Sequence, residues 1–223
     1  MSIRDNLEAV EERIAAACKK AGRKRDEVKL VAVSKTKPVE AVLEAAEAGQ
    51  MLFGENRVQE AQSKIPLYPG SLQWHLIGHL QSNKARIAAS GIFRMIHSVD
   101  SEKLLRALDE YAGMTLPVLI QVNISGEGSK EGCAPEEAAA LIEVANQCGK
   151  VEVHGLMTIP PFTPDPEKAR IYFSNLRKLR DQLQQETGTP LPELSMGMSH
   201  DFEVAIEEGA TFIRVGSEIF GQR

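Results

Sequence analysis

The sequence predicts a single (β/α)8 barrel with one additional helix at its N-terminus. Eight short apolar runs alternate with segments of helical periodicity, and a length of 223 residues lies in the range of that fold. A strand followed by a helix implies right-handed crossovers and a parallel sheet, and eight such strands imply closure into a barrel. We expect one domain over residues 1–223.

The elements can be placed in order along the chain. An amphipathic helix opens it and stops at Gly22, with an apolar face made of Leu7, Val10, Ile14, Ala17 and Cys18. The strand candidates are residues 28–35, 51–55, 72–78, 94–100, 117–125, 151–159, 191–199 and 212–217. The helical segments between them are residues 39–48, 57–65, 82–89, 101–112, 135–147, 166–186 and 201–208.

An open, doubly wound sheet is the rival architecture. Its GxGxxG turn after the first strand is absent, and residues 34–38, SKTKP, stand in that place, so the barrel is favoured. Two longer loops, at residues 126–132 and 160–166, follow the fifth and sixth strands. Both belong to the face where the strands end, and each is either a lid or a plain connection.

Composition and charge exclude several classes of function. A net charge of −5 with mixed signs along the chain gives no basic stripe, which argues against a nucleic-acid ligand. The N-terminus lacks the apolar stretch of a signal peptide, and no run reaches membrane-spanning length. Cys18, Cys133 and Cys148 are widely spaced and form no CxxC pair. We expect a cytoplasmic protein with free, buried thiols.

Lys35 is the first candidate functional residue. It ends the apolar run Leu30–Val33 at the point where a buried strand opens into a loop, and that is the active face of a parallel barrel. A lysine on a desolvated strand end can lose its proton and add to a carbonyl. A lysine that snorkels to solvent or pairs with a phosphate is the other interpretation, and this segment alone leaves both open.

The last two strand ends predict an anion site. Ser199 stands at the expected N-cap of the helix at residues 201–208, beside free backbone N–H groups. Gly216 allows close backbone approach and Ser217 adds a hydroxyl. Loops after strands seven and eight of a barrel commonly bind phosphate, so these residues together favour an anion there.

Arg214 and the histidines raise two further questions. Arg214 alternates with apolar neighbours, so it faces the barrel mouth and needs a partner, either a ligand or a carboxylate such as Glu55 or Glu218. His75 and His79 are four residues apart, but no carboxylate or cysteine follows at ligand spacing, so we expect no metal site.

Specific motifs extend over nearly the whole chain: VAVSKTKP at 31–38, FGENRVQE at 53–60, WHLIGHLQSNK at 74–84, QVNIS with SKEG at 121–132, GLMTIP at 155–160, SMGMSHDFEVAIEEGA at 195–210 and RVGSEIFG at 214–221. In these motifs the chain closely resembles the pyridoxal phosphate homeostasis protein family. The resemblance implies a barrel of the alanine-racemase type that carries pyridoxal 5′-phosphate (PLP).

The resemblance also implies roles for individual residues. Lys35 matches the lysine that holds PLP as a Schiff base, and Arg214 matches an arginine beside the pyridine nitrogen. The phosphate-binding positions are Ser199, Gly216 and Ser217, although position 217 is often threonine in relatives. Asn56, His75 and Met157 fall in motifs that border the cofactor. The alternative amines that could receive or hand over the aldehyde are Lys37, the foremost of them, and Lys84 and Lys130.

Three functions compete. The first is a PLP-binding homeostasis protein without strong catalytic activity of its own, a monomer that releases PLP to apo-enzymes or limits its free concentration. The second is a PLP-dependent amino-acid racemase; the chain shows neither the second domain of such racemases nor a tyrosine placed as their acid/base. The third is an aldolase-like barrel without cofactor. An arginine at the ring nitrogen weakens carbanion stabilisation, which favours the first.

Overall fold

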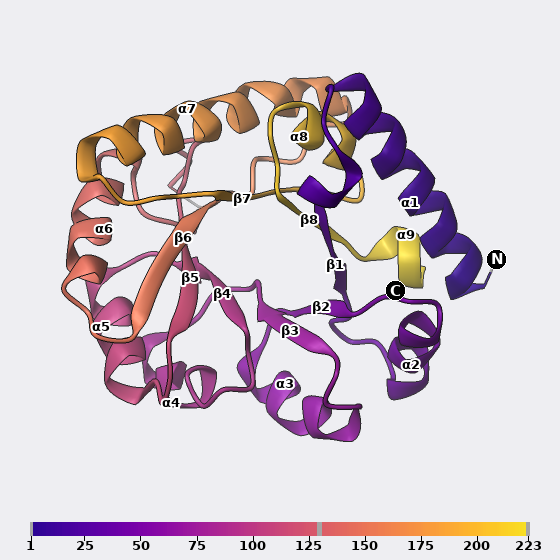
Figure 1. Cartoon of the computed structure of the whole chain (residues 1–223), viewed down its shortest axis with the longest axis horizontal. Helices are drawn as coiled ribbons and strands as arrows, with labels where there is room; N and C mark the ends of the chain where they lie inside the picture. The colour runs from indigo at the N-terminus through magenta and orange to yellow at the C-terminus, as the bar shows by residue number, and fades with distance from the viewer. Residues whose placement is uncertain (1, 129–130, 222–223) are drawn as a thin grey trace.

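The computed structural model describes residues 2–128 and 131–221, and in this part of the chain eight parallel strands close into a barrel (Figure 1). Each strand pairs with the next, and β8 pairs with β1. This confirms the predicted (β/α)8 fold. The strands are β1 (Lys29–Val33), β2 (Leu52–Glu55), β3 (Gln73–Leu76), β4 (Met95–Val99), β5 (Leu116–Gln121), β6 (Val151–Met157), β7 (Glu193–Met198) and β8 (Phe212–Val215).

The helices form the outer layer around the barrel (Figure 1). They are α1 (Ile3–Lys20), α2 (Val39–Glu47), α3 (Val58–Lys64), α4 (Ala85–Ala88), α5 (Glu102–Tyr111), α6 (Ala138–Asn146), α7 (Arg170–Thr187), α8 (Phe202–Glu207) and α9 (Ser217–Phe220). Short 3-10 helices are η1 (Arg25–Glu27), η2 (Ile65–Leu67), η3 (Ser82–Lys84), η4 (Pro135–Glu137) and η5 (Pro166–Ala169).

The boundaries differ from the prediction mainly at the ends of elements. The strand expected over residues 212–217 ends at Val215, and Ser217 instead begins α9, a helix that the sequence did not predict. The helix expected from residue 166 starts as the 3-10 helix η5, with a proline in its first turn, and becomes α-helical at Arg170. Apolar periodicity locates an element but not the residue at which its hydrogen bonding stops.

Two apolar layers hold the barrel together. Outward-facing strand residues pack under the helices, and inward-facing residues fill the interior as a separate cluster. The interior cluster consists of Val31, Ile77, Met95, Leu119, Met157 and Phe212. Because the interior is packed with side chains, a ligand has room only at the mouth, where the strands end.

The additional helix α1 packs against the outside of the barrel beside α2, α8 and α9 (Figure 1). Its predicted apolar face is buried. Arg13 forms ion pairs with Glu203 of α8, at 2.6 Å, and with Glu218 of α9. Asn6 donates from its side-chain amide to the Ile219 carbonyl at 2.9 Å. Helix α1 therefore restrains α9, the helix that begins at Ser217.

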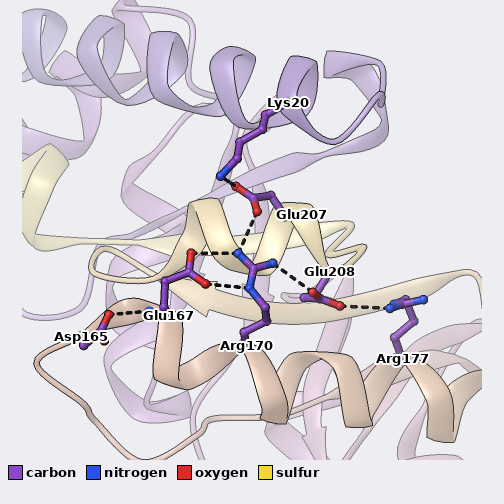
Figure 2. Close-up of polar contacts among 7 residues, drawn as sticks. All are labelled: Lys20, Asp165, Glu167, Arg170, Arg177, Glu207 and Glu208. Carbon is purple, nitrogen blue, oxygen red and sulfur yellow. Dashed lines mark hydrogen bonds and ion pairs between the residues drawn. The ribbon is translucent and has the colours of Figure 1, made fainter.

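An ion-pair network joins α1, α7 and α8 on the outer surface (Figure 2). Arg170 of α7 contacts Glu207 at 2.8 Å and Glu208 at 3.0 Å, both near the end of α8. Lys20 of α1 pairs with Glu207 at 2.6 Å, and Arg177 pairs with Glu208 at 3.0 Å. A connected network of this kind contributes more than isolated surface pairs, and it ties three segments that are distant in sequence.

Two further expectations concern free, buried thiols and the lack of a membrane-spanning segment. Cys18 and Cys133 are free and buried, as expected, whereas Cys148 is free but only half-buried. Among the helices described here, none combines the length and the apolar character that crossing a bilayer requires.

Candidate functional site

A cavity of about 370 Å³ opens at the face where the strands end. The barrel brings β1 beside β2 and β8, and β8 beside β7, so the loops that follow these four strands meet there. Six of the eight predicted site residues line the cavity: Lys35, Asn56, Ser199, Arg214, Gly216 and Ser217. Convergence of neighbouring strand ends explains why residues far apart in sequence share it.

Two lysines line the cavity two residues apart. Lys35 is half-buried and lies two residues after the end of β1. Lys37 also lines the cavity, but its amine donates to the carbonyls of Phe220, at 2.9 Å, and of Gly221, at 3.0 Å. Lys84 is not part of the cavity lining, and Lys130 lies outside the described residues.

Ser199 is not the helix N-cap that the sequence predicted. Helix α8 begins three residues later, at Phe202, with Asp201 in the cap position. The Asp201 carboxylate accepts from the Met198 N–H at 2.7 Å and so fixes the turn between β7 and α8. The Ser199 hydroxyl instead accepts from the Gly216 N–H at 3.3 Å, which joins the two predicted anion-binding loops.

Arg214 is buried on β8 and reaches the cavity from below. Its guanidinium donates to the Ser195 hydroxyl at 2.5 Å and to the Thr158 carbonyl at 3.0 Å. Burial lowers its pKa to about 10, with Asp201 opposing the shift, so it remains a cation at neutral pH. The alternative of an Arg–Glu pair is wrong for both candidates, since Glu55 pairs with Lys64 and Glu218 pairs with Arg13.

A hydrogen-bonded chain continues from Arg214 into the barrel interior. The Ser195 hydroxyl lies 2.8 Å from Nδ1 of His97, and Nε2 of His97 lies 2.9 Å from Nδ1 of His75. A guanidinium only donates, so the Ser195 hydroxyl accepts from Arg214 and its own O–H can donate a hydrogen bond to Nδ1 of His97. This order makes both imidazoles neutral Nε2–H tautomers and holds the guanidinium in place.

His75 and Met157 lie beneath the cavity and do not line it. Met157 is fully buried in the interior cluster, and His75 is the last member of the chain described above. Their predicted contact with a ligand stays a prediction. In the structure both residues lie under the cavity. Met157 packs in the interior cluster, and His75 is linked through His97 and Ser195 to Arg214.

The buried histidines predict a loss of stability in mild acid. Burial lowers the pKa of His75 to about 3 and that of His97 well below its usual value, whereas in the unfolded chain both titrate near 6.5. Below about pH 6.5 the unfolded chain therefore binds more protons, and acid favours unfolding. We expect the free energy of unfolding to fall by up to about 1.4 kcal/mol per pH unit for each histidine.

Urea denaturation between pH 6.5 and 5 measures this slope, and His75→Gln should reduce it by the share of one histidine. In that window the raised pKa values of Glu55 and Asp201, caused by burial, act in the opposite direction. Because those two carboxyl groups can offset the histidines in the wild type, the comparison with His75→Gln decides: a slope that this substitution leaves intact would contradict the burial of a neutral imidazole.

Sequence reasoning missed several residues that line the cavity. They are Val33, Ile77, Ile159, Met198, His200 and Gly221. His200 is the most informative of them, because its Nε2 lies 3.1 Å from the Pro164 carbonyl and its ring packs against Phe162. It therefore holds the proline-rich loop of residues 160–166 against the rim. His200 directly follows Ser199 in the loop after the seventh strand, and this position could have predicted that it lies near the cavity.

The fold and the site together define a class of protein: a (β/α)8 barrel of the alanine-racemase type whose mouth brings a lysine, an arginine and two serines to one cavity. The family model "Alanine racemase, N-terminal domain" matches residues 6–223. The pyridoxal phosphate homeostasis protein of Aquifex aeolicus is 46% identical over 100% of this chain and 99% of its own length. That of Vibrio cholerae is 45% identical over 100% of this chain and 97% of its own.

A solved structure agrees with these relatives. PipY of Synechococcus elongatus PCC7942, with PLP bound, matches with a TM-score of 0.80 and 40% identity, covering 95% of this chain and 100% of that one. The chain belongs to the pyridoxal phosphate homeostasis protein family, as its sequence motifs predicted.

Proposed function

We propose that this protein binds PLP in the cavity at the barrel mouth and takes part in the homeostasis of that cofactor. The observation that carries the proposal is that one cavity is lined by a lysine, an arginine and two serines, namely Lys35, Arg214, Ser199 and Ser217. The names of the relatives and the PLP-bound PipY structure support it.

The cavity fits PLP in size and in chemistry. A volume of about 370 Å³ suits a single small molecule. The hydroxyls of Ser199 and Ser217 offer donors to a phosphate, and the apolar side chains of Val33 and Ile77 offer a surface for a ring. A side chain at position 216 would crowd Val33, since a Cβ there would lie 3.3 Å from both the Cβ and the carbonyl oxygen of that residue.

Lys35 and Arg214 have distinct roles in this proposal. When bound, PLP would supply an aldehyde, and the Lys35 amine would hold it. The Arg214 guanidinium would be the partner of the ring nitrogen, and it would disfavour protonation there because a cation opposes a second positive charge beside it. The bound ring would then be a weak electron sink, which suits storage and release better than catalysis.

We further propose that the protein is a cytoplasmic monomer that supplies PLP to apo-enzymes. The alternative, a racemase-like enzyme, has one observation in its favour: His200 lines the cavity and could exchange a proton. Its Nε2 is engaged with the Pro164 carbonyl, which restrains the ring. The three tyrosines weaken that alternative, since Tyr68, Tyr111 and Tyr172 all lie away from the cavity lining.

The proposed function is tested with the purified protein and PLP. Titration should produce a yellow species of defined stoichiometry, and mixing the loaded protein with an apo-enzyme should restore the activity of that enzyme. Exchange of the α-proton of L-alanine in D2O, followed by NMR, should run no faster than with free PLP. Absence of PLP binding would overturn the proposal, and rapid exchange would favour the racemase-like enzyme.

Replacement of Ser199 tests the phosphate site. Ser199→Ala should weaken PLP binding by about 1–2 kcal/mol, roughly 5- to 30-fold, because a hydrogen bond to a charged group is lost. Binding of pyridoxal, which has no phosphate, should not change. Ser90→Ala removes an exposed hydroxyl that bonds to the Ile87 carbonyl, and serves as the control. An equal loss for both ligands would remove Ser199 from the phosphate site.

A further inference from the structure

Lys35 occupies a strained turn. The Lys37 N–H donates to the Ser34 carbonyl at 3.1 Å, which closes a turn over residues 34–37. Thr36 within it has a φ of 61°, and it is the one residue other than glycine with positive φ among those the structure describes. A left-handed conformation costs a β-branched residue about 1–2 kcal/mol. Contacts from outside the turn must therefore hold it.

Two charged side chains of α3 supply those contacts, one on each side of Lys35. The Glu60 carboxylate accepts from the Thr36 N–H at 2.6 Å. The Lys64 amine donates to the Ser34 carbonyl at 2.7 Å. Glu60 and Lys64 are one helical turn apart and 3.5 Å from each other. We call Glu60 and Lys64 the α3 clamp.

A buried carboxylate fixes the clamp. Glu55 is fully buried, and one of its oxygens, Oε1, accepts from the Lys64 amine at 2.8 Å and from the Ser34 hydroxyl at 2.7 Å. Burying such a pair costs desolvation energy that its attraction rarely exceeds, so fold stability does not account for it well. None of the three charged residues lines the cavity. Their contacts converge instead on the backbone that flanks Lys35.

The α3 clamp bears on a choice between two amines. Lys35 and Lys37 both line the cavity, and the direction of each stem depends on the backbone of the turn they share. The Lys37 amine is also held by the carbonyls of Phe220 and Gly221. If the backbone of residues 34–37 changes conformation, the Lys35 side chain is no longer held in one direction. The Lys37 amine can then break its hydrogen bonds to the carbonyls of Phe220 and Gly221.

We propose that Glu60 and Lys64 are positioning residues that select Lys35 over Lys37 as the amine that reacts with an aldehyde in the cavity. This inference rests on the proposed function and deepens it. In the reaction the nitrogen lone pair of the neutral amine attacks the aldehyde carbon. A C=N bond forms, and the carbonyl oxygen leaves as water with the two amine protons.

The test measures the selectivity of the unloaded protein with formaldehyde as the probe. Limiting formaldehyde with cyanoborohydride methylates reactive lysines, and tandem mass spectrometry gives the ratio of modification at Lys35 to that at Lys37. Glu60→Ala and Lys64→Met should each lower this ratio at least threefold relative to the wild type. Glu102→Ala, which removes an exposed pair with Arg106, should leave it unchanged.

Glu60→Gln separates position from charge. Its amide oxygen can still accept the Thr36 N–H, so the ratio should stay close to that of the wild type, whereas an effect of charge alone would make Gln and Ala behave alike. Glu60 is at the surface, with 25% of its side chain exposed, so these two variants decide the question even if Lys64→Met fails to fold. Equal ratios in wild type and Glu60→Ala would overturn the proposal.

A parallel arm with PLP and borohydride separates this inference from the proposed function. If the wild type captures no PLP, the proposed function fails, and the formaldehyde ratio still judges the clamp. If the wild type captures PLP on Lys35 and Glu60→Ala does so with the same preference over Lys37, the clamp is wrong and the proposed function stands.

Discussion

Lys35→Ala is expected to abolish covalent capture of PLP while the barrel stays folded. Lys35 lines the cavity, and alanine at this position removes its amine, whereas the Lys37 amine is held by the carbonyls of Phe220 and Gly221. Lys35 is only half-buried, and one side chain at the barrel mouth contributes little to the core, so the cost in stability should be below about 1 kcal/mol. Borohydride reduction followed by intact-mass measurement checks the capture, and thermal unfolding checks the fold.

Lys84→Ala is the matched control, because Lys84 lies outside the cavity lining and its replacement should leave capture unchanged. Residual modification in Lys35→Ala that maps to Lys37 would indicate that the neighbouring amine takes over. Full stoichiometric capture in Lys35→Ala would contradict the assignment of Lys35, and an unfolded variant would contradict the expected small cost.

Gly155→Ala is expected to cause the largest loss of stability of any single methyl group added to the barrel. Gly155 of β6 pairs with Glu193 of β7. A Cβ at position 155 would overlap the Glu193 carbonyl oxygen and lie 2.6 Å from its carbonyl carbon. The neighbouring atoms are backbone and cannot rotate away, so the two strands must separate. We expect the free energy of unfolding to fall by about 3–5 kcal/mol, as for the most disruptive substitutions in a protein core.

Gly149→Ala is the control for Gly155→Ala, since nothing lies within 4 Å of the added Cβ there. Urea denaturation of both variants and the wild type gives the difference in unfolding free energy. Because β6 leads into Ile159, which lines the cavity, a folded Gly155→Ala protein should also bind PLP less tightly. Equal midpoints for the two glycine variants would contradict the close approach of β6 and β7.

Much of the cavity could be predicted from strand ends alone. Lys35, Asn56, Ser199, Gly216 and Ser217 all follow apolar runs, and a closed parallel barrel brings such positions to one face. The predicted capping role of Ser199 failed because the turn before α8 takes two more residues, with Asp201 holding it. Turn length is set by local backbone hydrogen bonds that apolar periodicity does not report.

The alternation of side chains between the two faces of a strand could have excluded Glu55 as the partner of Arg214. Gly54 faces the interior, since a Cβ there would meet Val31 and Ile77, so its neighbour Glu55 faces outward and cannot reach Arg214. The actual partners are Ser195 of β7 and Thr158, which directly follows β6. Which inward residues meet across a barrel depends on strand stagger, and a single sequence does not give it.

Buried charge was the hardest feature to predict. Lys64 ends an amphipathic helix, a position where a lysine is normally solvated, yet only 8% of its side chain is exposed. Its burial depends on Glu55, which precedes it by nine residues and lies on a different element. The pair is visible only once β2 and α3 are placed against each other.

The most direct test of the central claim is to map the lysine that carries PLP in the wild-type protein. The protein is saturated with PLP, reduced with borohydride and digested, and the modified residue is located by tandem mass spectrometry. The account predicts one modification per chain, on Lys35. A protein that gains no modification, or one in which the label is spread over surface lysines with no preference for Lys35, would contradict it.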